Sequence, residues 1–207
     1  KQSEMTIFVP GDHNVLNALA AIASARYEGI EYDDIAKGLY NFTGAIRRFQ
    51  KIDEINGITI VDDYAHHPAE LSVTLKAAKA LDFKRIWAVF QPLTYSRTKI
   101  LLEDFKDALS IADIAVITDI MGSREKNTIG IYSRDLAGII PGSICFDCDN
   151  DIQDRQTAER KNENFAEIAE YITENARPGD LVITCGCGDV YKLAKMLAKK
   201  LKEIYNG

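Results

Sequence analysis

Three short polar segments carry most of the side chains that could do chemistry in this sequence. Each directly follows an apolar run with the length of a buried strand: Asp62–Pro68 follows ITIV, Gln91–Thr98 follows WAVF, and Cys185–Asp189 follows LVIT. In open α/β sheets, ligands bind beyond the carboxyl ends of the parallel strands. We therefore expect the three segments to open on one rim of a sheet, where a reaction could take place.

The first segment combines carboxylate, phenol and imidazole groups. It holds Asp62, Asp63, Tyr64, His66 and His67, a set that can hydrogen-bond a ribose, an amine or a phosphate. The proline that follows is typical of the first turn of a helix, which would put imidazole donors at the positive end of a helix dipole. A solvated strand end is the alternative, and the histidine pair favours a functional role over it.

The second segment contains one cation, Arg97, near the start of a predicted helix. Its guanidinium can make the forked contact that a carboxylate or phosphoryl group requires. Tyr95, Ser96 and Thr98 would supply neutral hydrogen bonds around it. The alternative is a surface arginine behind a helix cap, and the segment taken alone leaves both interpretations open.

The third segment, Cys185–Asp189, is a glycine turn that would let backbone amides approach a ligand. Two glycines without a following Lys-Ser or Lys-Thr pair are weak evidence for a phosphate loop, so tight helix packing is the favoured explanation. Cys185-x-Cys187 and Cys145-x-x-Cys148 could together bind zinc, because both spacings permit chelation. Neither pair has the setting of a zinc knuckle, so we predict reduced thiols and no metal site.

A further candidate site lies in the Ala-rich helix predicted over His13–Tyr27. His13, Asn14 and Asn17 occupy its first turns, and the two asparagines share a face. Carboxamides can read the edge of a base through paired donor and acceptor groups. Helix capping by Asn14 is the alternative, but it leaves Asn17 unexplained.

The elements that would position these residues follow from hydrophobic periodicity and turn signals. Residues 45–207 alternate strands and helices, and several strands are apolar on both faces, which is typical of a parallel sheet covered on both sides. The predicted fold class is α/β: a doubly wound, mostly parallel, Rossmann-like sheet with helices on both faces. Residues 1–44 are predicted to be a partial segment of a second domain, joined through a linker at Gly44–Phe49.

The predicted elements begin with a short strand over Met5–Val9 and a helix capped by Asp12, and Asn56-Gly57 predicts a hairpin turn. Between Met121 and Gly142 we expect surface loops with one short helix. The other strands are predicted over 49–55, 58–62, 85–91, 114–118, 143–146 and 180–185, and the helices over 13–27, 33–41, 68–81, 98–111, 133–139, 164–176 and 190–205.

Bulk composition argues against several classes of protein. The 207 residues are 46% hydrophobic and 27% charged, which is ordinary for a globular protein. A net charge of −6 with scattered Lys and Arg argues against a nucleic-acid partner. No apolar run approaches the roughly 20 residues that span a bilayer, and the first residues have no signal pattern, so we expect no membrane partner and a cytoplasmic location.

Five strings, in this order, carry a family resemblance. They are VPGDHNVLNALAAIA, GAIRRFQ, VDDYAHHPAE, FQPLTYSRT and ITCGCGDVYK, and they span residues 9–192. Together they resemble the Mur ligase family, and within it the branch that adds L-alanine to UDP-N-acetylmuramate. The resemblance implies a three-domain cytoplasmic enzyme in which ATP and Mg²⁺ convert the muramate carboxylate to an acyl phosphate, which the amine of L-alanine then attacks.

The resemblance also implies roles for particular residues. Asn14 and Asn17 would contact the adenine, Asp63 would hold the ribose, and Arg48 would approach the nucleotide phosphates. The place where the amino acid and the acyl phosphate meet would be lined by Tyr64, His66, His67 and Arg97, with His66 and Arg97 as the catalytic residues.

Two departures from the family pattern limit what these residues are expected to do. The glycine-rich phosphate loop with its Lys-Thr pair, and the domain that binds the UDP-sugar, have no counterpart here. Residues 1–44 therefore resemble the tail of the central ATP-binding domain, Mg²⁺ is expected to be held mainly by the absent part, and the 207 residues alone should be inactive. The second departure is Leu93, where the family usually has His.

Three alternatives stay open beside the L-alanine ligase. The ligase that recycles murein tripeptides shares the His-His-Pro element. A nucleotide-binding module without chemistry is the second alternative. The third is a metal-binding domain that uses the four cysteines, and it predicts stoichiometric zinc.

Overall fold

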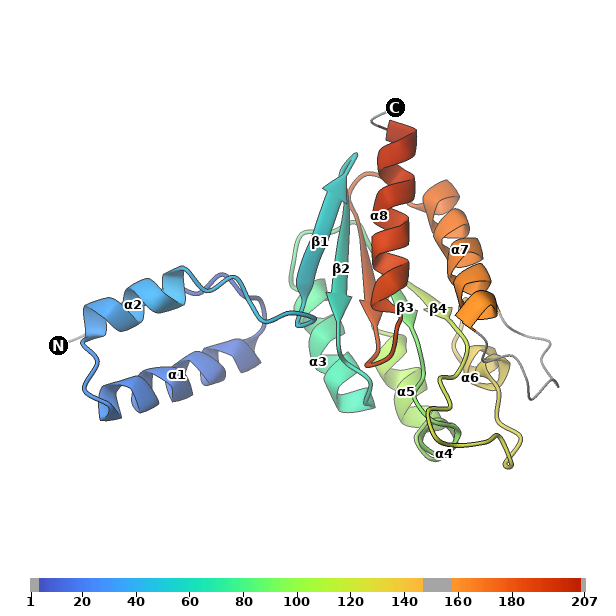
Figure 1. Cartoon of the computed structure of the whole chain (residues 1–207), viewed down its shortest axis with the longest axis horizontal. Coiled ribbons are helices and arrows are strands. Elements are labelled where there is room, and N and C mark those ends of the chain that lie inside the picture. Colours follow the sequence, from blue (N-terminus) through green and yellow to red (C-terminus); the bar gives the residue numbers. More distant parts are fainter. Residues whose placement is uncertain (1–3, 147–157, 206–207) are drawn as a thin grey trace.

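A helix-covered sheet forms the main body of the protein, and two N-terminal helices extend to one side of it (Figure 1). The structure, a computed structural model, describes residues 4–146 and 158–205. The strands are β1 (Gln50–Ile55), β2 (Ile58–Asp63), β3 (Arg85–Phe90), β4 (Ile114–Ile117), β5 (Ile144–Cys145) and β6 (Asp180–Cys185). The helices are α1 (Asp12–Tyr27), α2 (Tyr32–Tyr40), α3 (Pro68–Lys79), α4 (Tyr95–Ile100), α5 (Leu102–Leu109), α6 (Ser133–Ile139), α7 (Ala158–Asn175) and α8 (Tyr191–Tyr205).

The described residues form a six-stranded sheet in the order β1-β2-β6-β3-β4-β5. β1 and β2 pair antiparallel, and all other neighbouring strands pair parallel. Asn56 and Gly57, with φ of 50° and 73°, make the tight turn between β1 and β2 that their residue types predict. The doubly wound, mostly parallel α/β fold expected from the sequence is confirmed.

Side chains of the central strands alternate between two hydrophobic cores, one on each face of the sheet. In β3, Ile86, Ala88 and Phe90 point into the first core, and Trp87 and Val89 point into the second. Helices α3, α5 and α6 cover the first face, and α7 and α8 cover the second. Burial on both faces explains why these strands have no polar side.

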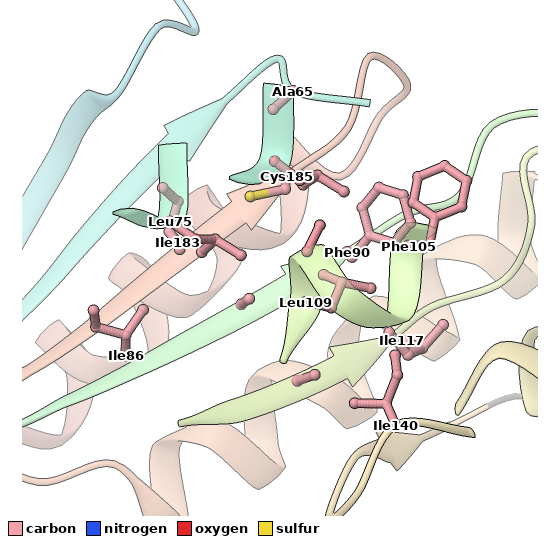
Figure 2. Close-up of a cluster of buried hydrophobic side chains, with 14 of the residues drawn as sticks. Ala65, Leu75, Ile86, Phe90, Phe105, Leu109, Ile117, Ile140, Ile183 and Cys185 are labelled. Atoms are coloured by element: carbon pink, nitrogen blue, oxygen red, sulfur yellow. The ribbon is translucent and has the colours of Figure 1, made fainter. Parts of the chain in front are cut away.

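An aromatic pair ties the sheet to the helices that follow the second polar segment. Phe90 at the end of β3 and Phe105 of α5 are both fully buried, with ring centroids 5.1 Å apart. Figure 2 shows them in the first core with Leu109 and Ile117 close by. Packing of α5 against the strand thus fixes the place of α4, which directly precedes it.

Three predictions of local structure are wrong. Met5–Val9 is not a strand, because no described strand lies beside it to complete its backbone hydrogen bonds. The helix predicted over 98–111 is two helices, α4 and α5, separated at Leu101, where φ of −105° and ψ of 26° interrupt the α-helical backbone. Asp12 does not cap α1; it is the first helical residue, and the N-cap is Gly11 with φ of 98°.

The remaining helices and strands occur where they are predicted and differ from the predictions only in length. β5 is shorter than predicted, and α7 begins at Ala158, before the predicted start. The loops around α6 have the predicted character, and residues 44–49 lie outside helices and strands and turn the chain, with positive φ at Arg47 and Phe49. None of the helices described is long and apolar enough to cross a lipid bilayer.

Phe105→Ala should lower the free energy of unfolding by about 3–5 kcal/mol, because it removes a fully buried ring and leaves a cavity beside Phe90. Urea denaturation followed by circular dichroism measures this loss. Ile100→Ala is the control: its side chain is 79% exposed, so the change should stay within about 0.5 kcal/mol. Equal losses in the two variants would contradict the packing role of Phe105.

Candidate functional site

The three polar segments meet at the carboxyl ends of β2, β6 and β3, as predicted. In the sheet register, Cys185 lies between Asp63 on one side and Phe90 on the other. Beyond the strands, Gly186 N donates to Asp63 O at 3.1 Å, and Gln91 N donates to Cys185 O at 3.0 Å. One rim of the sheet therefore carries all three segments.

Arg47, which the sequence analysis did not single out, joins the linker to this rim. Its guanidinium donates to Asp62 Oδ2 at 2.9 Å, to Gly186 O at 2.6 Å and to Gly188 O at 3.1 Å. The ring centroid of Tyr64 lies 4.9 Å from its Cζ atom. The only sequence signal is the Arg-Arg pair, and φ of 60° at Arg47 belongs to the turn that directs this arginine to the rim.

Asp62 is the buried carboxylate that Arg47 meets. It is 1% exposed, and Thr184 Oγ1 donates to its Oδ1 at 2.6 Å. Burial raises the pKa of Asp62, while the bonds from Thr184 and Arg47 act in the opposite direction. The carboxylate therefore depends on these two donors, and its role in the described structure is to hold the rim together.

Asp63 anchors the linker from the opposite face of β2. Its Oδ2 accepts from Phe49 N at 2.7 Å, and its Oδ1 accepts from Ala65 N at 2.8 Å and from Thr74 Oγ1 at 3.3 Å. A carboxylate offers about four acceptor positions, so these protein donors occupy most of them. A ribose hydroxyl would compete for the remainder, and the ribose contact stays a prediction.

A cavity of about 650 Å³ opens between α1, the linker and α3. Its lining includes Asn14, Asn17, Arg48 and Asp63, so all four residues predicted to bind a nucleotide face one space. Its volume falls within the range of small-molecule sites. The wall opposite the asparagines is mostly apolar and includes Phe49, Ala69, Val73 and Ala77.

The two asparagines are linked to each other. Asn14 Nδ2 donates to Pro10 O at 2.7 Å, and Asn17 Nδ2 donates to Asn14 Oδ1 at 3.2 Å. No side chain caps the start of α1, so the capping alternative for Asn14 is wrong. Asn14 instead ties the helix to the preceding segment and orients Asn17 in the cavity.

The two histidines have different surroundings. His67 is the N-cap of α3: its Nδ1 accepts from Ala69 N at 3.4 Å, and Glu70 completes a capping box. His66 Nδ1 lies 3.1 Å from Tyr64 O and 3.2 Å from Glu70 Oε2. Both neighbours of His66 Nδ1 are acceptors, so this nitrogen is placed to donate to them.

Arg97 projects from the first turn of α4. Its Nη1 is buried and has no hydrogen-bond partner among the described residues. Buried donors are nearly always paired, so this nitrogen is the donor at the rim that most needs an acceptor. Burial raises the pKa of the Cys187 thiol, and the charges of Arg97 and Arg47 oppose this.

Close packing explains the glycines of that turn, but the closest neighbours are the segment after β3 and Met121 and not the helix that the sequence predicted. A Cβ at Gly186, where φ is 150°, would lie 3.1 Å from Gln91 O. A Cβ at Gly188 would collide with the side chains of Gln91 and Met121. Side chains at Gly186 and Gly188 would therefore crowd the segment after β3 where it meets the turn after β6.

The cysteines form no evident metal site in the part of the chain that is described. Cys185 is fully buried, and burial raises the pKa of its thiol well above the ordinary value. No group of three or more His, Cys, Asp or Glu among the described residues could hold a metal ion. Cys148, the fourth thiol of the zinc hypothesis, lies outside the described residues.

The family described as "Mur ligase, glutamate ligase domain" matches residues 47–188. The chain belongs to this family. The match to this Mur ligase domain runs along the rim from Arg47 to Gly188 in the glycine turn. The family resemblance seen in the five strings is thereby confirmed.

Relatives extend the similarity beyond the family match. The UDP-N-acetylmuramate--L-alanine ligase of Lachnospira eligens is 45% identical over 201 residues, which are 96% of this chain and 41% of that protein. The enzyme of the same name from Acetivibrio thermocellus is 46% identical over 191 residues, 92% of this chain and 38% of that protein. This Mur ligase chain thus spans about two fifths of the length of the curated relatives it matches.

The fold is similar to that of a crystal structure in the same family. The UDP-N-acetylmuramate-alanine ligase MurC of Thermotoga maritima superposes with a TM-score of 0.76 at 24% identity. The alignment covers 99% of this chain and 41% of that chain. At this identity the likeness supports the Mur ligase fold, including the N-terminal helices.

Arg47→Ala should destabilise this Mur ligase domain by about 3–5 kcal/mol, because it leaves the buried Asp62 carboxylate without its charged partner. Chemical denaturation measures the loss. Arg48→Ala is the matched control, since Arg48 is exposed and should cost no more than about 0.5 kcal/mol. If the two variants were equally stable, Arg47 would not be the anchor of the rim.

Proposed function

We propose that the chain is the C-terminal part of an ATP-dependent ligase that joins L-alanine to UDP-N-acetylmuramate through an acyl phosphate. The observation that carries the proposal is that one cavity is lined by Asn14, Asn17, Arg48 and Asp63, and that Asp63 also belongs to the rim of the sheet. The names of the relatives at 45% and 46% identity support the choice of substrates. We also propose that residues 1–44 and residues 45–207 belong to two different domains. The complete ligase is proposed to be cytoplasmic.

The cavity suits a nucleoside with phosphates at its edge. The Asn14–Asn17 pair offers carboxamide groups for a base edge, and Val73 and Ala77 offer an apolar surface for the base itself. Arg48 is an exposed cation at the same cavity, suited to an anionic phosphate. These residues would hold ATP, whose phosphoryl group activates the carboxylate.

At the rim, the side chains of this chain would position the reacting groups of the substrates and neutralise their charges. Arg97 would donate through Nη1 to an oxygen of the carboxylate or the acyl phosphate. His66, with Nδ1 protonated, would accept a proton from the alanine ammonium at Nε2, leaving the neutral amine that attacks. Catalysis of this kind is mostly positioning and charge stabilisation.

Other residues would shape the place where the amino acid binds. Tyr64 packs edge-to-face on His66, with ring centroids 5.6 Å apart, and would line the same place. His67 would act mainly by starting α3 in the right place. Mg²⁺ is the expected companion of ATP, and we assign it no ligand in this chain.

A second candidate is the ligase that recycles murein tripeptides, which shares the His-His-Pro element, and Leu93, where the family usually has His, weakens the choice of L-alanine. Leu93 is partly exposed and pairs with Met121 through a parallel backbone bridge beside α4. Phosphate release by the complete ligase, with ATP, Mg²⁺ and UDP-N-acetylmuramate, separates the two functions. Turnover with L-alanine supports the proposal, turnover only with the tripeptide supports the second candidate, and no turnover with either leaves a nucleotide-binding module.

Asn17→Ala in the complete ligase should raise the KM for ATP about tenfold, which corresponds to the loss of about 1.4 kcal/mol of binding. The KM for L-alanine should not change, because Asn17 lies in the cavity and not at the rim. Ser24→Ala, an exposed position farther along α1, is the control. An unchanged KM for ATP would remove the cavity from the nucleotide site.

Arg97→Ala should lower kcat about a hundredfold or more, because it removes a charged donor from the place where negative charge develops. The same assay at saturating ATP measures this loss. Lys106→Ala, a partly exposed cation in α5, should leave kcat unchanged. Unaltered turnover by the Arg97 variant would exclude it from the reaction.

A further inference from the structure

Glu125, in the loop between β4 and α6, reaches across to the start of α4. Its Oε2 accepts from Ser96 N at 2.9 Å, and its Oε1 accepts from Ser96 Oγ at 2.5 Å. The bonds from Ser96 hold the pKa of this carboxyl below its ordinary value, so it is ionised at neutral pH. A charged acceptor is thus held against the first turn of the helix that carries Arg97.

This contact supplies a cap that α4 does not make for itself. Threonine is a favoured N-cap residue, but Thr94 has φ of 62° and ψ of 142°, and its side chain makes no cap bond. The backbone of Thr94 instead donates to Met121 O at 2.9 Å. Glu125 therefore satisfies amide groups at the helix start that the local sequence leaves open.

The loop Met121–Ile129, which we name the brace, holds α4 at more than one point. Met121 N donates to Pro92 O at 2.8 Å, just before the helix. Lys99 Nζ donates to Ile129 O at 2.9 Å, on the far side of Arg97 in sequence. The brace thus contacts the chain both before and after the turn from which Arg97 projects.

Arg97 needs such support because nothing in the described structure pairs with its Nη1. An arginine side chain has about 2 kcal/mol of rotamer entropy, so an unpaired guanidinium stays aimed only if its surroundings restrain it. The charge of Arg97 lies close enough to Glu125 to help lower the pKa of that carboxyl. Glu125 can therefore restrain Arg97 through the backbone of α4 and through its charge.

We propose that Glu125 is a positioning residue for Arg97: by capping α4 from the brace, it holds the guanidinium ready for an anionic group of the substrate at the rim. The identity of that anion rests on the proposed function. The ordering of Arg97 by Glu125 does not depend on the proposed function, and it can be measured without any reaction.

The first experiment measures the order of Arg97 in the 207-residue chain by ¹⁵N relaxation of its Nε–Hε group, together with hydrogen exchange of the Ser96 amide. Glu125→Ala should make the Arg97 side chain mobile and speed Ser96 exchange at least tenfold. Glu103→Ala, which removes an exposed carboxylate paired with Lys106, should change neither. Arg97 relaxation that stays the same in Glu125→Ala overturns the proposal.

The second experiment uses the complete ligase. Glu125→Ala should lower kcat about tenfold to a hundredfold with an unchanged KM for ATP, because a misplaced catalytic group slows the reaction without affecting the nucleotide cavity. In an Arg97→Ala background, Glu125→Ala should have no further effect, whereas additive losses would overturn the proposal. If Glu125→Ala does not fold, Glu125→Gln, which keeps one acceptor oxygen, is measured instead and should give a smaller loss in the same direction. A wild-type ligase without amino-acid-dependent turnover would refute the proposed function, while the relaxation result would still decide the role of Glu125.

Discussion

The guanidinium of Arg47 lies where the linker, the end of β2 and the turn after β6 come together. A buried carboxylate is costly unless it is paired, and Asp62 has Arg47 as its cation. The carbonyl groups of the glycine turn meet the same guanidinium, so one side chain satisfies acceptors from segments far apart in sequence. Because Asp63 follows Asp62 on a strand, it points to the opposite face and receives Phe49 N there. The rim and the cavity thus share one anchored linker.

The first turn of α3 connects the two halves of the site. Glu70 completes the capping box that starts the helix, pairs with His66 Nδ1 on the rim side, and also lines the cavity. Burial alone would raise the pKa of Glu70, but the backbone bond from His66 and the neighbouring positive charges lower it on balance. One carboxylate therefore orients the proposed base and borders the proposed nucleotide site. A change at the rim or in the cavity would therefore affect the other part of the site through the first turn of α3.

Much of this arrangement could be predicted from the sequence, because it depends on local pattern. Apolar runs followed by polar clusters predicted the rim, and strands of this kind have their carboxyl ends on one side of a parallel sheet. Asn14 and Asn17 could be placed on one face from helical spacing alone. The rest depends on contacts between distant segments. Nothing in the type of Arg47 distinguishes it from Arg48; only the positive φ of the turn sends one inward and leaves the other exposed. The start of α4 was misplaced for the same reason, since its cap comes from Glu125 and not from the preceding residue.

The order of the strands has a consequence for how the protein reaches this structure. β6 lies between β2 and β3, yet it comes after all other strands in sequence. Until residues 180–185 are available, β2 and β3 each have an unpaired edge, and the turn that receives Arg47 does not exist. Long-range parallel pairing of this kind is slow, because the loop-closure entropy must be lost before the contacts form. Folding during synthesis would therefore pass through a stage in which two apolar strand edges need protection, and the site would be assembled in the last step.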